Sequence, residues 1–138
     1  MEVSVNYLAV LLAGMSSMLV GSVWYAKPVF GDKWAKLVKL DDKKMKAGAA
    51  RALIVAFIMS LLTAYVIAHV TYLSEAFFNN SHFQSSVSTA FWLWLGISAT
   101  QILTHDSFEQ RPRQLTILTL GNQFVTLMFM GVVIGLLS

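Results

Sequence analysis

Four stretches of this chain are each long and apolar enough to cross a lipid bilayer as a helix. About 20 mostly apolar residues span the hydrocarbon core, and a helix satisfies its own backbone hydrogen bonds there. None of the four stretches contains an Asp, Glu, Lys or Arg, and they are residues 3–26, 52–73, 83–104 and 115–137. The sequence therefore predicts an all-α fold, with residues 1–138 forming a single transmembrane domain built as an integral membrane four-helix bundle.

The composition excludes several other classes of protein. Only 12% of the residues are charged and 57% are hydrophobic, which is too apolar for a soluble domain of this size and for a disordered chain. The absence of cysteine excludes a disulfide framework and a cysteine nucleophile. We expect no nucleic-acid partner, because all ten basic residues lie in two short loops.

The basic residues give the chain an orientation. Eight of them lie in the loop of residues 27–51 and two in the loop of residues 105–114, whereas the termini and the loop of residues 74–82 have none. Short loops rich in Lys and Arg stay in the cytoplasm. We therefore expect both basic loops to be cytoplasmic and both termini to lie on the outer side of the membrane.

Several helix ends carry local signals. Pro28 disfavours helical geometry at Lys27 and should end the first helix near residue 26. Asp41 is a candidate N-cap that would start the second helix well before its apolar part. Ser81 fits a capping box at the start of the third helix, and Pro112 suits the first turn of the fourth.

Small residues mark the faces by which membrane helices pack. They recur at every fourth position in the first span (Ala9, Ala13, Ser17, Gly21) and in the second (Ala52, Ala56, Ser60, Ala64, Ala68). We predict that these two stripes face each other. In the last span, Gly131 and Gly135 either pack inside the bundle or join two copies in a homo-oligomer, and we favour the bundle.

The first basic loop has an apolar face of its own. Phe30, Trp34, Leu37 and Val38 follow helical spacing, and lysines flank them. This pattern predicts a short interfacial amphipathic helix between spans 1 and 2, lying on anionic membrane lipids. A docking surface for a cytosolic protein partner is the alternative.

The sequence offers few candidates for chemistry. His105, Asp106 and Glu109 could bind a metal, but we expect Glu109 to pair with Arg111, Arg113 or a loop lysine instead. Because no catalytic motif, phosphate-binding loop or zinc motif occurs, we expect no enzymatic activity, no metal and no cofactor.

Among the uncharged polar residues inside the spans, three amides are candidates for a site. Gln101, Asn122 and Gln123 carry amides that need partners in hydrocarbon. They either form an intramembrane polar site or only join helices by hydrogen bonds, and the second reading is the simpler one.

Two motifs resemble those of a known family. The first comprises Gly21, Trp24, Tyr25, Pro28, Phe30, Gly31 and Trp34, and the second Phe108, Glu109, Arg111 and Pro112. In this respect the chain is similar to the small bacterial membrane proteins of the domain of unknown function 1761 family. The resemblance implies four spans in the bacterial cytoplasmic (inner) membrane and supplies no activity.

Both motifs lie at the cytoplasmic ends of helices, where they would build a cap. The cap is either structural or surrounds a site for an anionic or aromatic ligand lined by Arg111, Trp24 and Trp34, and we favour the structural role. The sequence thus favours a non-enzymatic membrane protein whose basic cap contacts lipid headgroups or a protein partner. The alternative is a subunit of a small oligomeric transporter or channel, because four such helices scarcely enclose a pore alone.

Overall fold

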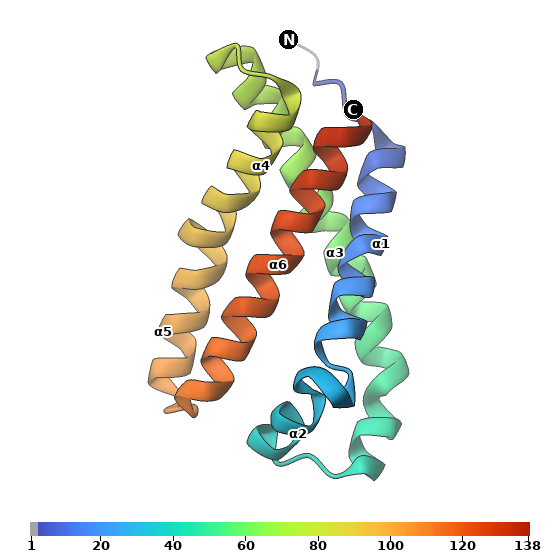
Figure 1. The fold of residues 1–138 in the computed structure, drawn as a ribbon, viewed down its shortest axis with the longest axis vertical. Helices are drawn as coiled ribbons and strands as arrows, with labels where there is room; N and C mark the ends of the chain where they lie inside the picture. Colours follow the sequence, from blue (N-terminus) through green and yellow to red (C-terminus); the bar gives the residue numbers. More distant parts are fainter. Residues whose placement is uncertain (1–2) are drawn as a thin grey trace.

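The computed structural model describes residues 3–138 and is helical almost throughout (Figure 1). Its elements are α1 (Tyr7–Trp24), the π-helical turn η1 (Lys27–Gly31), α2 (Asp32–Val38), α3 (Asp42–Phe78), α4 (His82–Leu93), the π-helical segment η2 (Trp94–Ala99), α5 (Thr100–Phe108) and α6 (Arg113–Leu137). No strand occurs in this part of the chain. α4, η2 and α5 form one continuous helix of 27 residues, and η1 leads directly into α2.

Four helices are long and apolar enough to cross a membrane, namely α1, α3, the continuous helix of α4 to α5, and α6. They alternate in direction, which brings both termini to one end of the bundle and residues 27–51 and 105–114 to the other (Figure 1). The predicted fold class is confirmed, including the short helical segment between the first and second spans. We call the two ends the terminal end and the basic end.

The two stripes of small residues meet only in part. The stripe residues buried there are Ala9, Ala13, Ser17, Ser60, Ala64 and Ala68. Midway along the helices, Ser60 Oγ donates a 3.2 Å hydrogen bond to the carbonyl of Gly14. Nearer the basic end, Gly21 and Ala56 line a pocket instead. The predicted contact is therefore right for the terminal half and wrong for the basic half, where open space separates the stripes.

α4 covers the glycine pair of α6. A Cβ on Gly131 would lie 2.7 Å from the Cβ of Ala90 and 3.0 Å from the carbonyl oxygen of Ser86. A Cβ on Gly135 would overlap Ser86 Oγ and lie 2.9 Å from the ring of Phe83. Because no larger residue fits at either position, the pair serves packing inside the bundle and offers no free face to a second copy.

The boundary between α1 and η1 differs from the expectation. α1 ends at Trp24, and the residue with extended backbone is Ala26, at φ −66° and ψ 143°. Lys27 begins η1, so the prediction that Pro28 would make it non-helical is wrong. Pro28 stands at the start of this new turn, where its missing N–H leaves no helical hydrogen bond unmade.

The capping signals of Asp41 and Ser81 are confirmed, whereas Pro112 is the N-cap of α6 and not, as predicted, part of its first turn. The carboxylate of Asp41 accepts a 2.7 Å hydrogen bond from the backbone N–H of Lys44. The hydroxyl of Ser81 accepts one of 3.3 Å from the backbone N–H of Gln84, and Pro112 directly precedes α6. Capping lets α3 reach 37 residues, so that it extends beyond its apolar stretch at both ends.

Candidate functional site

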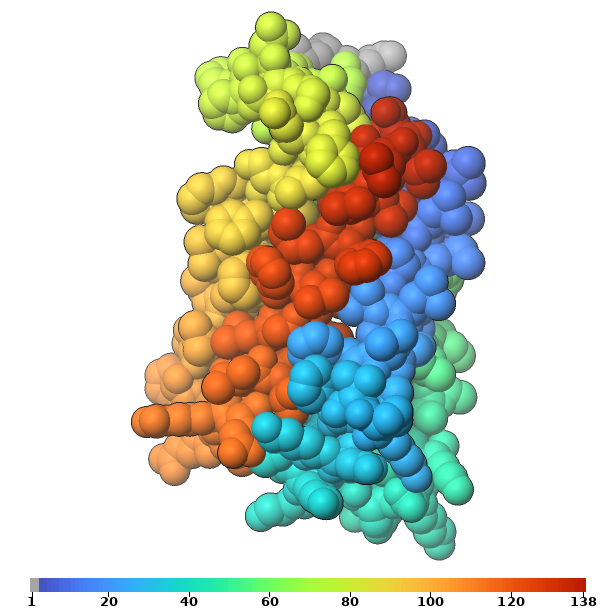
Figure 2. Space-filling view, in the orientation of Figure 1, coloured from blue at the N-terminus to red at the C-terminus, as the bar shows by residue number. Residues whose placement is uncertain are grey.

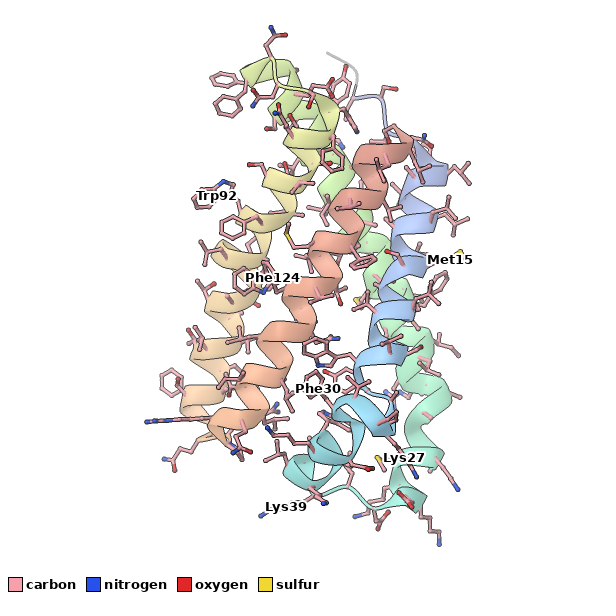
Figure 3. All side chains as sticks on the ribbon, in the orientation of Figure 1. Met15, Lys27, Phe30, Lys39, Trp92 and Phe124 are labelled. Carbon is pink, nitrogen blue, oxygen red and sulfur yellow. The ribbon has the colours of Figure 1, made fainter. Side chains whose placement is uncertain are left out.

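The first motif folds into an aromatic cluster at the basic end of α1. The ring centroids of Trp24 and Phe30 lie 4.7 Å apart, and those of Tyr25 and Trp34 lie 5.4 Å apart in an edge-on pair. Figure 3 shows Phe30 in the bend between α1 and α2, with Lys27 at the periphery. Each such pair contributes about 0.5–1.5 kcal/mol beyond area burial. Residues 27–38 are thus held against the bundle, and they lie beside the basic end of α6 (Figure 2).

Two glycines allow this cluster to form. A Cβ on Gly31 would overlap the carbonyl oxygen of Tyr25, and one on Gly121 of α6 would lie 3.0 Å from the ring of Trp24. Trp24 therefore reaches α6 at a position that has no side chain. Gly21 is different, because a Cβ there would meet nothing within 4 Å.

The second motif forms the turn between α5 and α6. Gln110 adopts a left-handed φ of 53°, and Pro112 follows it at the start of α6. Arg111 Nε donates a 2.7 Å hydrogen bond to Glu109 Oε2, which is one of the pairings expected. Within residues 3–138 no lysine forms a salt bridge with Glu109, so this residue does not join the two basic loops.

Asp106 is a buried carboxylate whose role the sequence reasoning missed. It is only 6% exposed, and its Oδ2 accepts a 2.7 Å hydrogen bond from Thr116 Oγ1. Arg111 Nε lies 3.8 Å from its other oxygen. This contact joins α5 to α6. The signal in the sequence was an acidic residue in the last helical turn, with a hydroxyl ten residues later across a proline turn.

The residues considered for metal binding do not converge. Nδ1 of His105 lies 3.5 Å from Asp106 Oδ1, and Nε2 of the same ring lies 3.3 Å from Glu109 Oε1. The two carboxylates therefore sit at different nitrogens and do not face one ion. In the described part of the chain, no group of three His, Asp or Glu is placed to hold a metal.

The two motifs do not share a cavity. Arg111 lines a hollow of about 660 Å³ together with other residues of α5, α6 and the turn between them. Trp24 and Trp34 are not among the residues that line it. This placement favours a structural role for the cap over a common ligand site.

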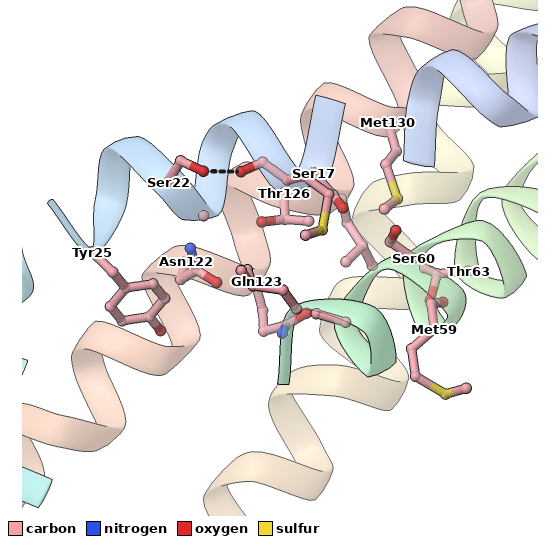
Figure 4. Close-up of a pocket in the computed structure, with 15 residues that line it drawn as sticks. Ser17, Ser22, Tyr25, Met59, Ser60, Thr63, Asn122, Gln123, Thr126 and Met130 are labelled. Atoms are coloured by element: carbon pink, nitrogen blue, oxygen red, sulfur yellow. Dashed lines mark hydrogen bonds between the residues drawn. The ribbon is translucent and has the colours of Figure 1, made fainter. Parts of the chain in front are cut away.

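A pocket of about 490 Å³ lies between α1, α3 and α6 in the basic half of the bundle (Figure 4). We call it the interhelical pocket. Asn122 and Gln123 line it from α6, Ser22 lines it from α1, and Tyr25 lines it from the C-cap of α1. Gln101 does not belong to this site, since it is exposed on α5 and lines a separate hollow. The structure therefore brings together two of the three amides singled out from the sequence.

The terminal end carries a polar pair that the sequence reasoning also missed. His82 Nδ1 and Glu75 Oε2 lie 2.6 Å apart and join α4 to α3. Together with Asn6 and Tyr72, they line a hollow of about 320 Å³. The signal in the sequence was an acidic residue and an imidazole seven residues apart, on either side of a short loop between two helices.

Comparison with known proteins gives a family and no activity. A family model described as "Protein of unknown function (DUF1761)" matches residues 8–135. This range includes both motifs and the interhelical pocket. No curated protein and no solved structure matches the chain.

Proposed function

Since the chain belongs to this family of unknown function, we propose a role from the geometry. The protein is a non-enzymatic, multi-pass protein of the bacterial cytoplasmic membrane, with both termini on the outer side, and its basic end contacts anionic lipid headgroups. The distribution of charge carries this proposal. The basic end has ten Lys and Arg against five Asp and Glu, whereas the described part of the terminal end has Glu75 and no basic residue.

The lysines of the basic end are free to meet headgroups. All seven are exposed, and across residues 3–138 none forms a salt bridge. A basic residue close to an anionic leaflet contributes about 1 kcal/mol to membrane attachment, and this falls off within a Debye length. The contribution therefore depends on how near each lysine lies to the membrane surface.

α2 lies where headgroups are expected. Tyr25, the aromatic partner of Trp34 in α2, stands next to Trp24 at the end of the first span, and Trp and Tyr prefer the membrane interface. The first lysines of α3 lie further out, because Lys44 precedes Ala52 by about 12 Å along the helix axis. That distance exceeds the Debye length of about 8 Å at physiological salt.

Lipid retention tests the headgroup contact. We expect replacement of Lys33, Lys36 and Lys39 by Gln to reduce the phosphatidylglycerol that remains bound in native mass spectra. The matched control replaces Lys43, Lys44 and Lys46 by Gln, which removes the same charge further from the interface and should retain more lipid. Equal retention by the wild type and the first variant would contradict the proposal.

The orientation has its own test. Alkaline phosphatase fused after Ser138 should be active, because it folds only outside the cytoplasm, and a fluorescent protein at the same place should be dark. Fusions after Lys39 should give the reverse pattern. An inactive phosphatase at Ser138 together with a bright fluorescent protein would invert the proposed topology.

A second candidate is a subunit of a small oligomeric transporter or channel, favoured by the amides in the interhelical pocket. Proteoliposomes tested with uncharged solutes such as glycerol and urea would show selective flux that Asn122→Leu abolishes. Wild-type vesicles as tight as empty ones would remove this candidate for those solutes and leave the headgroup proposal intact.

A further inference from the structure

The interhelical pocket is a space that the surrounding helices leave open. Its volume of about 490 Å³ falls within the range of about 300–1,000 Å³ that is usual for small-molecule sites. Gly21 lines it from α1, and a Cβ added there would meet nothing within 4 Å. The pocket therefore has room for part of a second molecule.

Three polar side chains in the pocket wall are accessible and have no hydrogen-bond partner. Tyr25 lines the pocket from the C-cap of α1, whereas Gln123 and Thr126 share one face of α6 at i and i+3 (Figure 4). Within residues 3–138, none of the three side chains forms a hydrogen bond. All three are half-buried, and their polar atoms stay accessible, in contrast to the buried Nδ2 of Asn122. A molecule in the pocket can therefore reach these two hydroxyls and this amide.

The depth of these groups makes an unpaired state costly. Gln123 follows Arg113, the first residue of α6, by about 15 Å along the helix axis. The hydrocarbon core of a bilayer is about 30 Å thick, so this amide lies well inside the membrane. Polar groups in an apolar environment are nearly always hydrogen-bonded. An occupant that supplies partners is therefore stabilised there.

The other hydroxyls of the pocket already have partners. Four of them donate to carbonyls of their own helices, at 2.9 Å for Ser17, 2.7 Å for Ser22, 2.8 Å for Ser60 and 3.0 Å for Thr63. The dashed line from Ser22 in Figure 4 illustrates this pattern. Recognition of an occupant therefore falls to the side chains of α6 and to Tyr25.

The wall contributed by α3 shows where the pocket opens. Its exposed lining residues are Leu53, Ala56 and Met59, and all three lie in the apolar stretch of residues 52–73. A molecule therefore enters from the hydrocarbon region of the membrane rather than from water. No Asp, Glu, Lys, Arg or His is among the residues that line the pocket, and a charged group would lose its hydration there without a counter-ion. An occupant that fits is an uncharged amphiphile dissolved in the membrane.

We propose that the interhelical pocket binds the head of one uncharged lipid of the acylglycerol class, whose hydroxyl and ester groups pair with Gln123, Thr126 and Tyr25. An amide and a hydroxyl can each donate and accept, so a head with both kinds of group satisfies all three side chains. The acyl chain then leaves over the exposed side chains of Leu53 and Met59. An acyl chain alone would leave the polar groups unpaired. The proposal rests on the membrane-spanning fold and does not depend on headgroup contact at the basic end.

The test titrates monoolein, an acylglycerol with free hydroxyls, into the full chain in detergent micelles and counts bound molecules by native mass spectrometry. We expect saturable binding of one molecule per chain. Gln123→Leu and Thr126→Val should each weaken the Kd about fivefold, which is the usual effect of one lost hydrogen bond. The matched control Gln101→Leu removes an exposed amide from another helix and should leave the Kd unchanged.

A second variant and a second ligand keep the test decisive if the α6 variants do not fold. Gly21→Leu has room to grow into the pocket and should lose saturable binding, whereas Gly96→Leu, at an open position on another helix, should keep it. Methyl oleate has the same acyl chain without hydroxyls and should bind at least fivefold more weakly than monoolein. Equal binding of the two ligands, equal binding by the two leucine variants, or binding that never saturates overturns the proposal. Equal affinities for Gln123→Leu and Gln101→Leu overturn the role of Gln123.

Discussion

The two halves of the bundle are built on different packing. In the terminal half, α1, α3, α4 and α6 meet through small residues, and Ala9, Ala13, Ala64 and Ala90 are fully buried. In the basic half, α1, α3 and α6 leave the interhelical pocket open, and residues 27–38 contact the bundle end through aromatic side chains. Close helix contact thus joins the spans in one half, while the other half contains an open pocket.

The halves also differ in how polar groups join helices. At the terminal end the Glu75–His82 pair links α3 to α4 through partly exposed side chains. At the basic end the Asp106–Thr116 hydrogen bond links α5 to α6 with the carboxylate buried. A buried charge has more to lose when its partner is removed than an exposed one. Substitutions can therefore separate the packing of one half from the polar contacts of the other.

The largest effect is expected in the terminal half. Gly135→Leu should lower the free energy of unfolding by about 3 kcal/mol, because the added side chain overlaps α4. Titration with sodium dodecyl sulfate, followed by circular dichroism, measures this. Gly96→Leu is the control, since a Cβ there would meet nothing within 4 Å, and its stability should stay near that of the wild type. An equal loss of unfolding free energy in Gly135→Leu and Gly96→Leu would contradict the tight contact between Gly135 and α4.

An intermediate effect is expected from Thr116→Val at the basic end. This change removes the hydroxyl donor from the buried carboxylate of Asp106 and should destabilise the protein by about 1.5–3 kcal/mol. Thr100→Val is the matched control, because its exposed hydroxyl bonds only to carbonyls of its own helix. If the control loses as much stability in the same titration, the link between α5 and α6 is not the cause.

Gly31→Ala should act locally. The methyl group overlaps the carbonyl of Tyr25 and displaces residues 27–38. The effect stays local because no residue of α2 is buried. We expect faster tryptic cleavage between Lys27 and Lys39 and a loss of about 1 kcal/mol in overall stability, comparable to one aromatic pair. Gly48→Ala, at an exposed position with free space, should not speed cleavage there. Unchanged proteolysis in Gly31→Ala would mean that the turn tolerates a side chain.

The smallest effect is expected from Glu109→Ala. Both Glu109 and Arg111 are exposed, and such surface pairs contribute about 0–1 kcal/mol. The unfolding midpoint should move only slightly. A loss of stability as large as that of Thr116→Val would show that Glu109 stabilises other parts of the basic end besides the turn between α5 and α6.

The four spans and the N-caps could be predicted from the sequence because they depend on local properties. Apolar length decides which segments enter lipid, and a cap such as Asp41 acts within its own turn. The π-helical turn was not predicted, since the contact of Gly31 with the carbonyl of Tyr25 is a detail of backbone geometry. The residue before a proline usually avoids helical geometry, yet a new helical turn begins here at Lys27, and the extended residue is Ala26.

The site was predicted less completely than the fold. The stripes of Ala, Ser and Gly show where helices can approach, but not where they stop approaching, because that depends on a third helix. Here α6 contributes Asn122 and Gln123 to the space that the first two spans leave open. Gln101 has the same amide on α5 but is exposed, which depends on helix rotation rather than on residue type.

Tyr25 belongs to both the wall of the interhelical pocket and the contact with Trp34 of α2. A molecule that moves this ring on entering the pocket also changes the position of α2 relative to the bundle. Thermodynamic reciprocity then requires that lipid composition at the surface alter affinity inside the bundle by the same factor. One aromatic ring thus links the wall of the pocket to the position of α2.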